Sequence, residues 1–272
     1  LVSRLVRDHC TVALGGDGAD ELFGGYMHYS KMLKSVKLRR LIPNSVSHAV
    51  AKLSNNYFPQ GMRGRSFLSS LSCDLRTGLP VVASLFDSKY RQKLTRDIGI
   101  AEKNSFSEEI WNSRIPSSDC LLDRTTRMDF MNYMPEDILV KIDRSSMLSS
   151  LELRSPFLDS EIIEFAFSEV PARFKADENQ RKILLKKLTE KLLPPEFDRQ
   201  RKQGFSIPLT QWLKGGVWRD FFFEILFSEE CIFKRECIQE LFKGIDKGRY
   251  NGERLFSLVM FELWRREYEI KI

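Results

Sequence analysis

The stretch "LGGDGADELFGGY", residues 14–26, directly follows the apolar run "TVAL" of residues 11–14. Its glycines are spaced as in a loop that binds phosphate, but such a loop normally supplies cations as well. This stretch instead carries Asp17, Asp20 and Glu21 and contains no lysine or arginine. It is therefore either an acidic turn at the start of a helix or a ligand site that works through its carboxylates.

The apolar run of residues 11–14 predicts a buried strand of a parallel sheet, because it is short, continuous and followed by glycines. A strand, a glycine loop and a helix in this order place the acids at the carboxyl end of the strand, where open α/β sheets bind ligands. The sequence shows one convincing run of this kind. We therefore expect the strands that pair with it to lie before residue 1.

The acids of the loop have two interpretations. Asp20 and Glu21 suit the first turn of a helix, because the helix dipole favours negative charge there. Alternatively, carboxylates beside closely spaced glycines can hold Mg²⁺ against a polyphosphate that approaches the backbone. The combination of acids with glycines favours the second interpretation.

The remainder of the chain is predicted to be mostly helical, with breaks at proline and glycine. Pro135 marks a helix start, and a basic helix is expected from Gln180 to Leu193. Basic residues in 30–40 are expected to form a solvated helix face. In the block of residues 134–159, alternating charges predict a buried or half-buried ion-pair network of three residues, Glu152, Arg154 and Asp159.

Three further residues of that block either belong to the same network or line an active-site cleft, namely Asp143, Arg144 and Ser146. The sequence leaves both interpretations open for them.

Composition excludes several classes of protein. The 272 residues carry 43 Lys and Arg against 37 Asp and Glu, and most of the excess lies in predicted helices, so we expect no nucleic-acid partner. No apolar run is long enough for a membrane span, so no membrane association is expected and the cytoplasm is the expected location. Five cysteines without a CxxC pair and three histidines predict neither a zinc site nor disulfides, and we expect the thiols to be reduced and buried.

Three blocks together carry a family resemblance. The stretch 14–26 resembles the S-G-[ED]-G-[ASG]-D-E-L-F-G-G-Y motif in the synthetase domain of glutamine-hydrolysing asparagine synthetases. "EDILVKIDRSSMLSSLELRSPFLD" (136–159) resembles that family's D-R-x-S-M-x-x-S-L-E-x-R-x-P-F-L-D stretch. "RKILLKKLTEKLLPPEF" (181–197) with "RKQGFSIPLTQWLKG" (201–215) is similar to its K-x-x-L-[RK] helix and K-x-G-F-x-x-P-L segment. The blocks occur in the order found in the family.

The resemblance implies an α/β fold like that of the adenine nucleotide alpha hydrolases, a parallel sheet flanked by helices. Residues 1–272 would form the C-terminal portion of the synthetase domain, with the last core strand and the acidic glycine loop in 1–30 and a helical part in 31–272. The family's S-G-G-x-D-S pyrophosphate loop and its N-terminal glutaminase domain, with its nucleophilic cysteine, do not occur in the sequence. The chain begins with Leu rather than Met, and we expect it to be part of a longer polypeptide and inactive alone.

The chemistry implied by the resemblance is ATP-dependent amide formation with Mg²⁺. A carboxylate, the aspartate side chain in the best-known members, is adenylated with release of pyrophosphate, and ammonia derived from glutamine then displaces AMP. Asp17 and Lys202 match catalytic positions, the first near the reacting carbonyl and the second at the α-phosphate. Asp20 matches the aspartate that holds Mg²⁺ through pyrophosphate. The remaining matched residues would bind the nucleotide cofactor, namely Gly15, Gly16, Gly18 and Lys182.

Two alternatives stay open. One is an amidotransferase of the same family that acts on another carboxylate, such as a uronic acid of a surface polysaccharide or a peptide carboxylate. The other is a non-catalytic helical scaffold, against which the presence of both acids and both lysines argues. Gly15 departs from the family's usual serine, and assembly as a homodimer is also left open.

Overall fold

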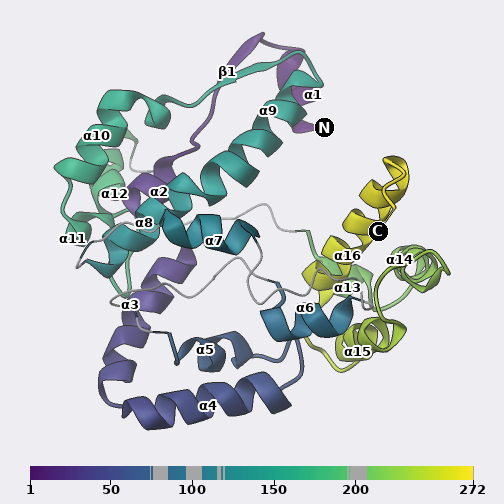
Figure 1. Ribbon diagram of the computed structural model, residues 1–272. Helices are drawn as coiled ribbons and strands as arrows, with labels where there is room; N and C mark the ends of the chain where they lie inside the picture. The colour runs from purple at the N-terminus through teal and green to yellow at the C-terminus, as the bar shows by residue number, and fades with distance from the viewer. Residues whose placement is uncertain are drawn as a thin grey trace. The chain divides into compact units, whose positions relative to one another are not determined.

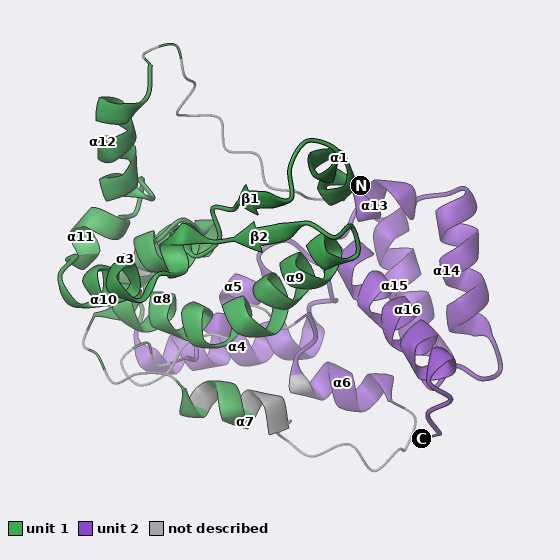
Figure 2. Ribbon diagram, turned by 90° about the horizontal axis from the view of Figure 1, so that it is seen from above, with its two compact units in different colours: residues 1–42, 74–79, 107–202 green, residues 43–73, 80–106, 203–272 purple. Residues whose placement is uncertain are grey.

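The computed structural model describes residues 1–73, 75, 85–95, 106–114, 118, 120–194, 196 and 207–271. They divide into two compact units, coloured separately in Figure 2. Unit 1 comprises residues 1–42, 74–79 and 107–202, and unit 2 comprises residues 43–73, 80–106 and 203–272. Helices dominate the described parts of both units (Figure 1). The glycine loop belongs to unit 1.

The strand predicted in residues 11–14 is confirmed as β1 (Val12–Leu14). It pairs in parallel with β2 (Glu152–Arg154), with Ala13 opposite Leu153, and Figure 2 shows the two arrows side by side. The expectation that the partners of β1 lie before residue 1 is therefore wrong for this neighbour. β2 has three residues, and two of them are charged. Its sequence therefore resembles part of an ion-pair network and not a strand.

The prediction that this strand is buried is also wrong within the described chain. Leu14 is 73% exposed, and Val12 is exposed on the same side of the strand. A parallel pair of strands normally has both faces covered by helices, so these apolar side chains mark a sheet whose faces are only partly covered by the described residues.

The loop after β1 leads into a short helix and a sharp turn. α2 (Ala19–Phe23) begins after Gly18 and ends at Gly24, and both glycines have a left-handed backbone, with φ of +93° and +68°. α3 (Met27–Arg40) follows. The left-handed Gly24 ends α2 and lets the chain change direction before α3.

Four helices of unit 1 pack against α2, namely α8, α10, α11 and α12. Pro135 lies at the start of a π-helical segment, η1 (Met134–Leu139), that continues into α9 (Val140–Met147). The remaining elements of this unit are α1 (Val2–Arg7), α7 (Phe106–Ser113), α8 (Leu121–Met131), η2 (Pro156–Leu158), α10 (Ser160–Ser168), α11 (Ala172–Lys175) and α12 (Ile183–Leu192).

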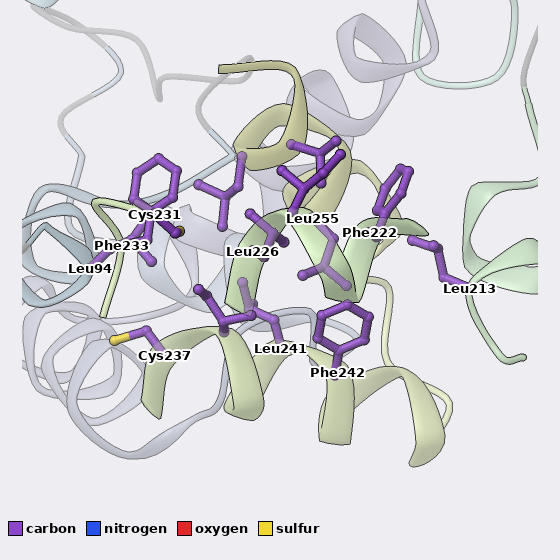
Figure 3. Packing of buried hydrophobic residues seen from close by; sticks show 14 of the residues in the cluster. Leu94, Leu213, Phe222, Leu226, Cys231, Phe233, Cys237, Leu241, Phe242 and Leu255 are labelled. Carbon is purple, nitrogen blue, oxygen red and sulfur yellow. The ribbon is translucent and has the colours of Figure 1, made fainter. Parts of the chain in front are cut away.

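Unit 2 is organised around one apolar core. Its C-terminal helices α14 (Val217–Phe227), α15 (Arg235–Asp246) and α16 (Gly252–Glu267) confirm the predicted helical end of the chain. Buried leucines and aromatic residues of these helices point toward one another in Figure 3. The other helices of this unit are α4 (Asn44–Tyr57), α5 (Arg65–Ser70), α6 (Ser88–Leu94) and α13 (Leu209–Trp212).

All five cysteines are free thiols, as expected. Cys231 and Cys237 are buried, whereas the other three are only half-buried, so the expectation of burial holds for two of them. No helix within the described ranges has both the length and the apolar character needed to cross a membrane.

Candidate functional site

The loop begins where β1 ends, and its first glycine continues the strand ladder. The Gly15 amide donates to the carbonyl oxygen of Arg154 at 2.7 Å. A Cβ at position 15 would lie 2.6 Å from the Asp17 Oδ2 and 3.2 Å from the Leu153 Cδ2. Glycine at this position therefore makes room for the Asp17 carboxylate at the end of the sheet.

Asp17 has a polar neighbour from the other strand. The Ser155 hydroxyl, immediately after β2, donates to Asp17 Oδ2 at 3.4 Å. The parallel pairing of β1 with β2 brings these two carboxyl ends together. Sequence reasoning missed Ser155, because it had not recognised β2.

Asp20 and Lys182 form the centre of the site. The Lys182 Nζ lies 3.0 Å from the Asp20 Oδ1, and both side chains are 26% exposed. The pair lies over the backbone of Gly25, where a Cβ would be 1.7 Å from Asp20 Oδ1 and 2.4 Å from Lys182 Cε. A side chain at position 25 would collide with this ion pair. The turn formed by Gly24 and Gly25, called the GG turn below, therefore needs glycine at its second position.

The chain before α12 brings Lys182 to this position. α12 begins at Ile183, so the basic helix expected from Gln180 starts three residues later than predicted. Lys182 itself has a left-handed backbone, with φ 52° and ψ 40°. The neighbouring Arg181 donates from Nη1 to the carbonyl oxygen of Gly25 at 3.2 Å. Arg181 and Lys182 therefore both contact the GG turn at Gly25.

A buried acid supports the turn from inside. Glu21 is 1% exposed and accepts a hydrogen bond from the Tyr26 hydroxyl. Burial raises the pKa of Glu21, and this hydrogen bond opposes the rise. Burial together with the same carboxyl group raises the pKa of Tyr26 well above its ordinary value. In the sequence Glu21 is one of the acids of the glycine loop, and no local pattern predicts its pairing with Tyr26.

A second polar pair adjoins the first. The His28 Nε2 lies 2.8 Å from an Asp129 carboxylate oxygen, and Asp129 is buried on α8. The His28 ring stacks on Tyr26 with centroids 5.4 Å apart and meets Tyr29 edge-on at 4.4 Å. Tyr26, which pairs with Glu21, thus also contacts His28, which pairs with Asp129. Because Asp129 lies far from the motif in sequence, no local signal could have identified it.

A buried cation lies behind the same turn. The Lys175 side chain is 1% exposed, and its Nζ is 3.7 Å from an Asp123 oxygen. Within the described residues its ammonium makes no hydrogen bond, although it lies 4.9 Å from the centre of the Phe167 ring. Burial lowers the pKa of Lys175, and the neighbouring Arg127 lowers it further, while Asp123 opposes the change.

The expected network of Glu152, Arg154 and Asp159 is not present in the form predicted. Glu152 and Arg154 do form an ion pair at 2.8 Å, but both side chains are exposed. Asp159 instead caps α10 by accepting from the Glu161 amide at 2.9 Å. The prediction of burial is wrong because the charged residues of β2 point outward, on the side of the strand opposite Leu153.

Of the three residues left open in the same block, Ser146 is buried and donates to the Asp143 carbonyl oxygen within α9. Asp143 and Arg144 are exposed on α9. Lys202, predicted to be catalytic, lies outside the described residues.

The side chains available as ligands determine which metal ion this site could bind. No group of three or more His, Cys, Asp or Glu that could hold a metal ion occurs in the described parts of the chain. Mg²⁺ usually binds through one or two carboxylates together with substrate phosphates. A single carboxylate such as Asp20 fits this mode, in which the cation arrives with a polyphosphate.

Comparison with known proteins agrees with the three blocks. The sequence profile of the asparagine synthase family matches residues 1–266. The chain is 29% identical over 267 residues to asparagine synthetase [glutamine-hydrolyzing] 1 of Bacillus subtilis, an alignment that covers 97% of this chain and 41% of the relative. It is 30% identical over 270 residues to a putative asparagine synthetase [glutamine-hydrolyzing] of Mycobacterium tuberculosis, covering 97% and 40%.

No solved structure gave a significant match. The chain spans about two fifths of the length of the curated relatives it matches. The match with the family profile extends over nearly the whole chain, from residue 1 to residue 266 near the end of α16. The chain therefore belongs to the asparagine synthase family.

Proposed function

We propose that this chain is part of an ATP-dependent carbon–nitrogen ligase that adenylates a carboxylate and converts it into an amide. The substrate would be the side chain of aspartate, ammonia would come from glutamine, and the products would be asparagine, AMP and pyrophosphate. The names of the relatives support this assignment, as does an acidic glycine loop at the carboxyl end of a parallel strand.

The observation that carries the proposal is the Asp20–Lys182 pair over Gly25. A phosphate site that used only acids would repel its ligand, and one that used only lysines could not recruit a divalent cation. Here an acid and a cation lie side by side, so that Asp20 would hold Mg²⁺ and Lys182 would contact phosphate oxygens. Bound Mg²⁺ would neutralise part of the polyphosphate charge.

The backbone before α2 supports a nucleotide at the same edge of the sheet. A Cβ at Gly16 would meet nothing within 4 Å, so the backbone there borders open space into which a ligand could fit. Gly18 takes a left-handed conformation that starts α2. We assign the nucleotide to Gly15, Gly16 and Gly18 with Lys182, and the catalytic roles to Asp17, which would orient or deprotonate the incoming amine, and Lys202.

The fold proposed for the complete domain is that of the adenine nucleotide alpha hydrolases. Residues 1–30 would supply its last core strand and acidic loop, and residues 31–272 its helical part. The exposed apolar side chains of β1 support further strands or helices against this sheet. We propose that a pyrophosphate loop and a glutaminase domain come from sequence outside these 272 residues, and that the chain alone does not catalyse the reaction. The complete enzyme would act in the cytoplasm.

The test is a panel of carboxylic acids given to the full-length enzyme, with pyrophosphate release measured in the presence of ATP, Mg²⁺ and either glutamine or ammonia. We expect release that depends on aspartate and is greatly reduced in the Asp20→Asn variant. Release with a uronic acid or a peptide carboxylate would instead assign a different substrate. Absence of release with every acid would overturn the proposal and favour a scaffold.

A further inference from the structure

Lys182 has an unusual backbone for a residue with a long side chain. Its φ of 52° lies in the left-handed region, which it shares with Ser150 and Glu269 among the described residues other than glycine. A left-handed conformation is unfavourable for any residue that carries a Cβ. Of these three residues, Lys182 lies in the candidate site. Strain of this kind persists only when the surrounding structure enforces it.

Asp177 enforces the turn that leads into Lys182. Its Oδ1 accepts hydrogen bonds from the Asn179 amide at 2.7 Å and the Gln180 amide at 2.6 Å. Its own amide donates to the Gln180 carbonyl oxygen at 2.9 Å, which closes the turn. The Ser30 hydroxyl on α3 donates to the Asp177 carbonyl oxygen at 2.8 Å and fixes the turn to the body of unit 1.

Arg181 fixes the other end of the turn. A backbone bridge joins Ala176 and Arg181 in antiparallel fashion, so the chain doubles back before α12. The Arg181 guanidinium then reaches the carbonyl oxygen of Gly25. The segment 176–182 is therefore fastened both to α3 and to the GG turn that borders Asp20.

The left-handed backbone of Lys182 sets the direction in which its ammonium group points. Lys182 is the residue before α12, and its side chain leaves the helix start and passes over Gly25 to Asp20. In a right-handed conformation Lys182 would extend α12 by one residue, and its side chain would follow the helix surface instead. The backbone conformation thus selects the direction in which the charge is presented.

We propose that Asp177 and Arg181 are positioning residues, which hold Lys182 in its strained conformation and so deliver its ammonium to Asp20 and to the phosphate oxygens that bind beside it. This inference rests on the proposed function. Neither residue touches the reacting atoms. Their effect passes through Lys182, so it falls on the affinity for pyrophosphate and not only on stability.

The chain offers a matched control. Asp159 caps α10 with the same chemistry, since its Oδ1 accepts from the Glu161 amide at 2.9 Å, a hydrogen bond that does not involve Lys182. Removal of such a cap usually destabilises the fold. The Asp177→Ala and Asp159→Ala variants should therefore lose similar stability, while only the first should disturb the site.

The experiment measures, in the full-length enzyme, the affinity for pyrophosphate with Mg²⁺ by titration calorimetry and the thermal midpoint of each variant. We expect Asp177→Ala to weaken pyrophosphate binding about tenfold, the equivalent of roughly 1.4 kcal/mol. Asp177→Asn keeps the accepting oxygen and should restore affinity to within about twofold. Arg181→Ala, which leaves the Asp177 turn intact, should weaken binding in the same direction, whereas Asp159→Ala should leave it unchanged.

Lys182→Gln separates this inference from the proposed function. If Lys182→Gln leaves pyrophosphate affinity unchanged, the proposed phosphate role of Lys182 fails. If Lys182→Gln weakens binding while Asp177→Ala and Arg181→Ala do not, only the positioning inference fails. Equal losses of affinity in Asp177→Ala and Asp159→Ala would also overturn it, because they would show a general effect of stability.

Discussion

The surroundings of the glycine loop in unit 1 and the core of unit 2 are built on different principles. In unit 2 one continuous cluster of buried apolar residues joins α6, α13, α14, α15 and α16 (Figure 3). Its buried acid, Glu262, accepts from the Ile232 amide at 3.0 Å and pairs with Arg265 at 2.8 Å. In unit 1 the buried apolar residues fall into small separate clusters around α2 and α3.

Four acidic or basic side chains are buried among the described residues of unit 1, namely Glu21, Arg124, Asp129 and Lys175. Glu21 has a raised pKa, Lys175 has a lowered pKa, and Lys182 adopts a strained backbone. Each of these features costs stability, and all of them lie on or beside α2 and the Gly24–Gly25 turn that follows it. The difference between the units indicates that unit 2 is optimised for packing, whereas unit 1 gives up stability to hold charges in fixed places.

The largest effect is expected from the core of unit 2. Leu241 is completely buried on α15, so Leu241→Ala should lower the free energy of unfolding by about 3 kcal/mol through loss of burial and formation of a cavity. Urea unfolding followed by tryptophan fluorescence measures this, because Trp212, Trp218 and Trp264 belong to this unit. Met260→Ala, at an exposed position on α16, is the control, and a loss below 1 kcal/mol at Leu241 would contradict the account.

Removal of the buried Lys175 charge in unit 1 should raise the free energy of unfolding instead of lowering it. Lys175→Met keeps the length of the side chain and removes a charge, so we expect a gain of about 1–2 kcal/mol at pH 7. Because the folded pKa of Lys175 is lowered, the unfolded chain binds more protons, and the gain should shrink as pH rises toward 10.5.

Thermal unfolding of Lys175→Met and wild type at several pH values tests this expectation. Lys186→Met, at an exposed position on α12, should change little. A net loss of stability in Lys175→Met at pH 7 would show that the interaction with Asp123 outweighs the cost of burial.

A smaller and oppositely pH-dependent effect is expected at Glu21. Its raised pKa means that the folded chain binds the extra proton, so stability from this group is present below its ordinary pKa of 4.5 and is lost as pH rises through the folded value. Glu21→Gln is permanently neutral, so it should match wild type near pH 4.5 and exceed it by about 1 kcal/mol at pH 7. Glu164→Gln, exposed on α10, provides the comparison, and a difference that does not vary with pH would refute the explanation.

The smallest effect is expected at the sheet edge. Glu152 pairs with Arg154 on the exposed side of β2, and Glu152→Ala should change stability by less than about 0.5 kcal/mol. Urea unfolding at low and high salt measures it. A loss above 1.5 kcal/mol would instead support the buried network that the charge pattern suggested.

Local patterns were enough to predict β1, the glycine loop and the helical remainder of the chain. They also identified Asp20 and Lys182 separately, through the motifs that contain them. They did not identify β2, because a strand of three residues with two outward charges carries no apolar run. The end of α2 at Gly24 depends on a left-handed backbone. Glycine can adopt this conformation, but its presence in the sequence does not predict it.

Long-range pairing accounts for the rest. Ser155 reaches Asp17 only because β1 and β2 pair, and Asp129 reaches His28 only because α8 packs beside the loop. The left-handed Lys182 is equally a product of its surroundings, since lysine has no intrinsic preference for that conformation. Sequence motifs thus indicated Asp20 and Lys182 as candidates, and packing determines how these two side chains meet.

The central claim is that Asp20 and Lys182 act as one unit on a Mg²⁺-bound polyphosphate. A double-mutant cycle with Asp20→Asn, Lys182→Gln and the combined variant, measured as pyrophosphate affinity with Mg²⁺ in the full-length enzyme, tests it most directly. We predict that each single variant weakens binding and that the combined loss departs from the sum by about 1 kcal/mol or more. Losses that add to within about 0.3 kcal/mol, or single variants with wild-type affinity, would contradict the claim.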